Sequence, residues 1–112
     1  MGNRLIINNI IWVVRFVSSD SAVLNRSDGS HTVGMTDGNL RTIFIDRNLR
    51  GAFLEKVLCH EICHAVCFSY GVRIPIETEE LIANWVSMYG RIVINGLDNL
   101  MDSINKIGTK AY

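Results

Sequence analysis

Two histidines and a glutamate interrupt an otherwise apolar run in the middle of the chain, "LCHEICHAVC" at residues 58–67. On an α-helix, residues four apart lie about 40° apart around the axis and one turn apart along it. His60 and His64 would therefore point the same way, with ring nitrogens close enough to share one ion, and Glu61 would lie just beside them. Burying these groups without a ligand carries a large desolvation cost. The pattern therefore predicts a metal site.

The spacing of these residues is that of the H-E-x-x-H motif. In this arrangement two neutral imidazoles bind zinc, and the glutamate takes a proton from a water that the metal acidifies. We therefore expect His60 and His64 to be metal ligands of one Zn²⁺ ion. Glu61 is expected to be the general base, which then passes its proton to a leaving amine.

A catalytic zinc needs a third protein ligand, with one position left for water. Cys67 lies on the same helical face as His60, but about 10 Å further along the axis. His60, His64 and Cys67 would lie at three different heights along one straight helix, so they cannot easily bind a single ion together. The third ligand should therefore come from another element.

The best donors lie in "ETEELIANW", residues 77–85, at the start of the next expected helix. Glu80 is preferred because Asn84 follows it on the same face, where its amide could hold Glu80 or a ligand imidazole. The helix dipole also favours acidic residues in the first turn of a helix, and this effect alone explains acids at these positions. Three other candidates stay open as the third ligand: Glu79, Glu77 and the loop residue His31.

The elements that position these residues divide the chain into strands followed by helices. "IIWVVRFV" at 10–17 and "LRTIFID" at 40–46 have the β-branched and aromatic content of strands, and "HTVGM" at 31–35 adds a short one. The turn signals "SDGS" at 27–30 and "TDGN" at 36–39 separate them. We therefore expect a small, mostly antiparallel sheet over about residues 5–46.

From Gly51 onward, apolar residues recur at helical spacing. The pattern predicts helices over about residues 50–70, 78–95 and 97–107, with Thr78 as an N-cap and Gly96 as a stop. Strands followed by helices predict the α+β class, and the length fits a single domain over residues 1–112. The residues expected in the core are Trp12, Phe16, Phe44, Phe68 and Trp85.

Composition limits the partners. Eleven basic and eleven acidic residues balance and are scattered, so we expect no nucleic-acid binding. The apolar stretch "LIINNIIWVVRFV" at 5–17 is too short to span a membrane and contains polar residues. All three cysteines lie within residues 59–67 rather than spread as a disulfide framework, so we expect reduced, packing thiols and a cytoplasmic protein.

Three stretches together resemble a known family: "GMTDGNLRTIFID" at 34–46, the H-E-x-x-H segment, and "EELIANW" at 79–85. The chain resembles the gluzincins, which carry H-E-x-x-H and a downstream glutamate ligand. More narrowly it is similar to ImmA/IrrE-type metallopeptidases, especially short stand-alone versions from phages and prophages. The family's E-x-x-A-[ND]-x-F pattern is met by Glu80, Ala83 and Asn84, with Trp85 next to the aromatic position. The similarity covers about residues 31–95.

The resemblance implies a zincin-like fold and a zinc-dependent endopeptidase. His60, His64 and Glu80 would be the ligands and Glu61 the general base. The strand near residues 40–46 would be the active-site edge, pairing with an extended peptide substrate by β-addition. The interval from His64 to Glu80 is short for gluzincins, and no sensor domain is visible, so the cleavage of a repressor is not carried over.

Two other function classes stay open. One is a non-catalytic metal-binding protein with a zincin fold, such as a phage factor that binds a host protein. The other is a metal-dependent hydrolase that acts on a non-peptide substrate. No residue stands out for stabilising an oxyanion, since Tyr70 and Tyr89 are expected to pack.

Overall fold

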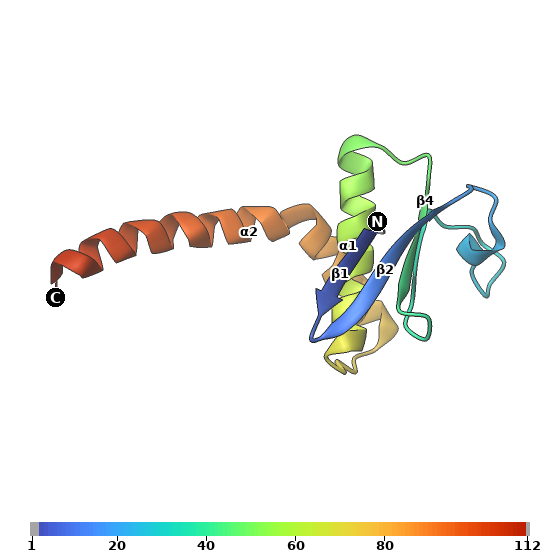
Figure 1. The fold of residues 1–112 in the computed structure, drawn as a ribbon, viewed down its shortest axis with the longest axis horizontal. Coiled ribbons are helices and arrows are strands. Elements are labelled where there is room, and N and C mark those ends of the chain that lie inside the picture. Colours follow the sequence, from blue (N-terminus) through green and yellow to red (C-terminus); the bar gives the residue numbers. More distant parts are fainter. Residues whose placement is uncertain (1–2, 112) are drawn as a thin grey trace.

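The computed structural model describes residues 3–111 and has the expected α+β class (Figure 1). A four-stranded mixed sheet comes first, and two helices follow it. The elements in chain order are β1 (Asn3–Ile7), β2 (Ile10–Val17), the 3-10 helix η1 (Ala22–Leu24), β3 (Gly34–Asp37), β4 (Thr42–Asp46), α1 (Gly51–Ser69) and α2 (Ile76–Ala111).

The strand order in the sheet is β1-β2-β4-β3. β1 pairs antiparallel with β2, and β3 pairs antiparallel with β4, whereas β2 and β4 are parallel. Asn8 and Asn9 form the first hairpin turn with φ of 50° and 63°, a conformation that asparagine tolerates better than most residues. The expectation of a mostly antiparallel sheet therefore holds for two of the three pairings.

The prediction that the strand near 40–46 forms the active-site edge is wrong. β4 lies inside the sheet and pairs with β2 on one side and β3 on the other, so its backbone groups already have partners. The outermost strand on this side is β3, which begins later than the expected 31–35 and takes in Thr36 and Asp37. The turn follows at 38–41, where Arg41 has a φ of 51°, and it returns the chain directly alongside β3.

α1 packs across the sheet and closes the core. The buried cluster consists of residues from the strands and from α1 and the loop before it: Ile7, Trp12, Ile43, Ile45, Leu49, Val57 and Ala65. The Trp12 indole N–H donates to the Ser69 hydroxyl over 2.8 Å, which fixes the end of α1 onto β2. Trp12 and Phe44 are buried as expected, but the expected burial of Phe16, Phe68 and Trp85 is wrong, since each is 43–50% exposed.

The two expected helices at 78–95 and 97–107 are one continuous helix, so Gly96 is not a stop. A glycine inside a helix costs only about 1 kcal/mol, and no proline follows that would force an end. α2 also begins earlier than expected, at Ile76, so Thr78 lies in its first turn rather than at the cap. Within residues 3–111, no helix is both long enough and apolar enough to cross a membrane.

Candidate metal centre

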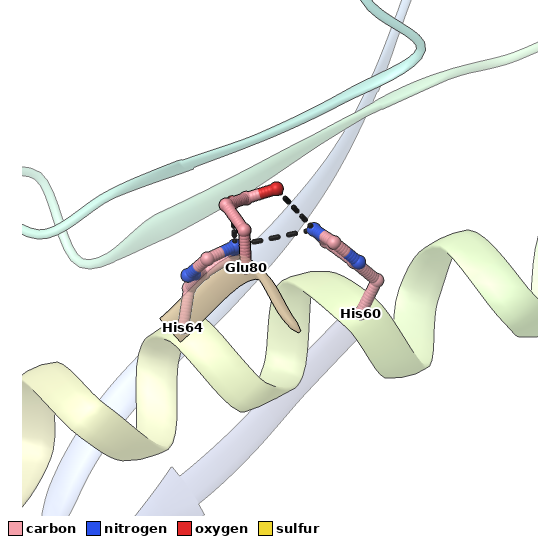
Figure 2. Close-up of side chains that lie close together, drawn as sticks. All are labelled: His60, His64 and Glu80. Carbon is pink, nitrogen blue, oxygen red and sulfur yellow. Dashed lines mark hydrogen bonds and ion pairs between the residues drawn. The ribbon is translucent and has the colours of Figure 1, made fainter. Parts of the chain in front are cut away.

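The three side chains expected to bind metal converge between α1 and α2 (Figure 2). The Nε2 atoms of His60 and His64 lie 3.2 Å apart. The Glu80 carboxylate lies 3.3 Å from Nε2 of His60 and 2.6 Å from Nε2 of His64. One ligand atom from each residue can be chosen so that all lie within 4.8 Å of one another. The structure thus brings the predicted set together.

These separations fit a zinc ion. Tetrahedral ligands bonded at about 2.0–2.1 Å lie about 3.3–3.4 Å from one another. The distance between the imidazoles and the distance from His60 to Glu80 are close to this value. The contact between His64 and Glu80 is shorter, and the half-exposed Glu80 side chain has room to rotate outward. Two imidazole nitrogens and one carboxylate are also a usual donor set for a catalytic zinc with one open position.

The two helices position the three candidate ligands through the spacing of residues along each helix. His60 and His64 are one turn apart on α1, and their rings meet in a T-shaped arrangement with centroids 4.9 Å apart. On α2, Ala83 is fully buried. Because it is small, it lets the two helices approach closely, and Glu80, three residues earlier, shares its face. The approach of the helices at Ala83 therefore places the carboxylate over the imidazoles.

Glu79 lies on the other side of the His64 ring from Glu80. Its Oε2 atom is 2.5 Å from Nδ1 of His64, and its side chain is only 17% exposed. A carboxylate there accepts the Nδ1 proton, which leaves the Nε2 lone pair free to bind a metal and fixes the orientation of the ring. Glu79, predicted from the sequence only as an alternative third ligand, thus orients the His64 ring and is not one of the converging set.

The remaining ligand candidates lie elsewhere. Glu77 is exposed at the start of α2. His31 lies in the loop region beside η1, where it contacts the Asn25 side chain over 2.9 Å and the Ser19 carbonyl. Asn84, expected to hold Glu80 or an imidazole, is exposed, and its main-chain carbonyl accepts a hydrogen bond from the Ser87 hydroxyl.

Glu61, the expected base, is 8% exposed and lies against β3. The Thr36 hydroxyl donates to its Oε1 atom over 2.7 Å. A Cβ added to Gly34 would come within 3.1 Å of Glu61 Cγ and 3.2 Å of Oε2, so only glycine allows the strand to approach this closely. The G-x-T-D stretch carried part of the family resemblance, but the contacts of Gly34 and Thr36 with the base emerge only in the structure.

One cleft joins these groups. It has a volume of about 560 Å³, and the two histidines, Glu61, Glu79 and Glu80 line it together with Gly34 and Thr36 of β3. β3 pairs only with β4 within the described sheet, so one side of its backbone faces away from the sheet. The cleft therefore contains a metal-ligand set, a carboxylate that could act as a base, and a strand at the edge of the sheet.

The cysteines line a groove other than the cleft of the candidate metal centre. Cys59, Cys63 and Cys67 are free thiols of intermediate exposure that line a groove between α1 and α2. Burial, reinforced by the neighbouring Cys59, raises the pKa of the Cys63 thiol to about 11. Burial also raises the pKa of Cys67, with a smaller effect of Glu79. At neutral pH both groups are therefore neutral thiols.

Comparison with known proteins gives no match. No family model, no curated protein and no solved structure matches the chain. The similarity to ImmA/IrrE-type metallopeptidases therefore stays a prediction, and the functional argument depends on the geometry of the cleft.

Proposed function

We propose that the protein is a zinc-dependent metallo-endopeptidase that acts on extended peptide segments in the cytoplasm. The observation that carries this proposal is the convergence of His60, His64 and Glu80 beside a buried glutamate in one cleft. The free thiols of α1 suit a reducing compartment.

In this proposal each residue has one task. His60 and His64 hold the ion through Nε2, Glu80 holds it through its carboxylate, and Glu79 keeps the His64 ring in place. Bound zinc would supply a Lewis acid that polarises the scissile carbonyl and lowers the pKa of a water. Glu61, held by Thr36, accepts a proton from the attacking water and delivers it to the leaving amine.

The substrate class follows from the strand beside the cleft. β3 lines the cleft and lies at the edge of the sheet. An extended peptide can pair with such an edge through main-chain hydrogen bonds, which hold the scissile bond along the strand with little demand on its side chains. This role belongs to β3 in place of the strand near 40–46.

The substitution Glu61→Gln tests the proposal. Digestion of a peptide library with and without a chelator measures the activity, and metal analysis measures zinc. We expect the variant to bind zinc like the wild type and to lose about 10²–10⁴-fold in cleavage rate. Glu55→Gln, at an exposed position of the same helix, is the matched control and should cleave normally. Zinc-loaded wild-type protein that cleaves no peptide would contradict the proposal.

One observation favours a non-catalytic metal-binding protein as the second candidate. Glu61 is buried, and its contacts with Gly34 and Thr36 join β3 to α1, so this carboxylate has a structural use even without catalysis. The two functions differ in what Glu61→Gln changes. If Glu61 is purely structural, the wild type cleaves no peptide and Glu61→Gln lowers the unfolding temperature. If Glu61 is catalytic, the wild type cleaves peptides and Glu61→Gln loses this activity.

A further inference from the structure

The C-terminal half of α2 extends clear of the sheet and of α1 (Figure 1). It makes the molecule 60 Å long against 31 and 29 Å in the other two directions. The helix carries apolar side chains that no other described part of the chain buries, with exposed fractions of 51–69% at Val93, Leu97, Leu100, Ile104 and Ile107. Such a surface is unusually apolar for a protein that remains monomeric.

These side chains follow a heptad rhythm. From Val93 to Ile107 the steps alternate between four and three residues, and one heptad earlier the same positions are Val86 and Gly90. We call this set the α2 stripe: Val86, Gly90, Val93, Leu97, Leu100, Ile104 and Ile107. The charged residues Arg91, Asp98, Asp102 and Lys106 lie outside it. A 3.5-residue repeat is typical of a helix that packs along another helix of the same repeat.

The stripe runs into an apolar groove at the base of α2. The groove has a volume of about 1150 Å³. Apolar side chains from both helices line it, and these include Leu54, Leu58, Ile62, Val66 and Ile82. Val86 and Gly90 belong to the groove and to the stripe. The two uncovered apolar surfaces are therefore continuous, and one occupant can cover both.

We propose that this occupant is α2 of a second copy of the chain, packed antiparallel along the stripe. A two-fold axis between Leu97 and Leu100 pairs each with the other in the second copy. The next layers pair Val93 with Ile104, and Gly90 with Ile107. Gly90 has no side chain where Ile107 arrives, so a large residue meets a small one, and the turn that carries Ile104 and Ile107 in each copy then lies over the end of the other copy's groove.

Charge and size are compatible with pairing between identical chains. The positions that flank the stripe carry no charge: they are Ile94 and Met101 on one side, and Gly96 and Ser103 on the other. Identical helices can therefore meet without charge repulsion along their edges. From Val86 to Ile107 the helix is about 32 Å long. Two copies would bury on the order of 1,000 Å², which is near the lower limit for a specific interface. The dimer should therefore depend on concentration.

Sedimentation of the full chain over a concentration series tests the proposal. We expect a reversible monomer–dimer equilibrium in the wild type. Leu97→Asp places a charge in the central layer and should weaken association at least 10-fold. Asn99→Asp adds the same charge at an exposed position outside the stripe and should leave association unchanged. A wild type that stays monomeric throughout, or two variants that associate equally, would overturn the proposal.

The orientation has its own test in a chain that carries both Val93→Cys and Ile104→Cys. Mild oxidation with diamide, followed by mass spectrometry of the linked peptides, shows which positions meet between copies. Antiparallel packing predicts links from 93 to 104, with the singly substituted chains giving little linkage. Links from 93 to 93 and from 104 to 104 would mean parallel packing and would overturn the proposed layers. Neither readout depends on metal binding or on peptide cleavage.

Discussion

At the scale of single residues, the candidate metal centre depends on which atom each side chain presents. His64 uses both ring nitrogens, Nδ1 toward Glu79 and Nε2 toward Glu80. Two adjacent acids on α2 therefore contact opposite sides of one imidazole ring. The Glu79 contact selects the His64 tautomer with a free Nε2 lone pair. A residue outside the ligand set therefore determines how well His64 can bind a metal.

Glu79→Gln should weaken zinc binding without removing it. The amide cannot accept the Nδ1 proton with the strength of a carboxylate, so we expect zinc affinity to fall by about 10–100-fold. Competition with a chromogenic chelator measures the affinity. Glu77→Gln removes the same charge from an exposed position two residues earlier and should have little effect. Equal affinities in the two variants would show that Glu79 acts only through its charge.

The thiol of Cys63 gives a prediction about pH. Since its pKa is raised to about 11, the thiolate that reacts with iodoacetamide is scarce at pH 7–8. Alkylation of Cys63, followed by mass spectrometry, should therefore be slow at neutral pH and should accelerate up to about pH 11. An alkylation rate that is already half-maximal near pH 8.5, the pKa of an ordinary cysteine, would contradict this effect of burial on the pKa.

At the scale of elements, the sequence predicted the parts that depend on local spacing. The helix that presents His60 and His64 follows from the positions of its own residues, and so does the strand at 10–17. The separate roles of Glu79 and Glu80 depend on how α2 is rotated against α1, which no local pattern encodes. The position of β3 at the edge depends on pairing between distant segments, which is why the strand near 40–46 was wrongly expected there.

The contact between β3 and α1 predicts that Gly34→Ala is destabilising. The added methyl group would come within 2.8 Å of Val57 Cγ1 and 3.1 Å of Glu61 Cγ, so β3 would have to move away from the base. We expect a loss of about 1–3 kcal/mol in the free energy of unfolding, together with slower cleavage. Chemical denaturation followed by circular dichroism measures the stability.

The same substitution in α2 is a matched control and a test of the helix. A Cβ at Gly96 would meet nothing within 4 Å, and alanine favours a helix over glycine by about 1 kcal/mol. Gly96→Ala should therefore raise the helical content or leave stability unchanged. Destabilisation by this change would mean that the helix is interrupted at Gly96, where the sequence alone predicted a stop.

At the scale of the whole molecule, one helix serves two purposes. The first turns of α2 bring Glu79 and Glu80 to the candidate metal centre, and the helix from Val86 onward carries the α2 stripe. Ala83, which is fully buried, lies between these regions on a helix that packs against α1. In a dimer formed through the stripe, α2 would pack on α1 near its N-terminus and on the second copy towards its C-terminus. The turn that carries Glu79 and Glu80 would then belong to a helix held at both ends.

The central claim is that His60, His64 and Glu80 bind one zinc ion, and X-ray absorption at the zinc edge tests it most directly. The purified protein should contain about one zinc per chain, with only nitrogen and oxygen neighbours at about 2.0–2.2 Å. Glu80→Ala should lower the zinc content while the fold persists. Protein without zinc after reconstitution, or a sulfur neighbour at about 2.3 Å that points to a cysteine ligand, would contradict the account.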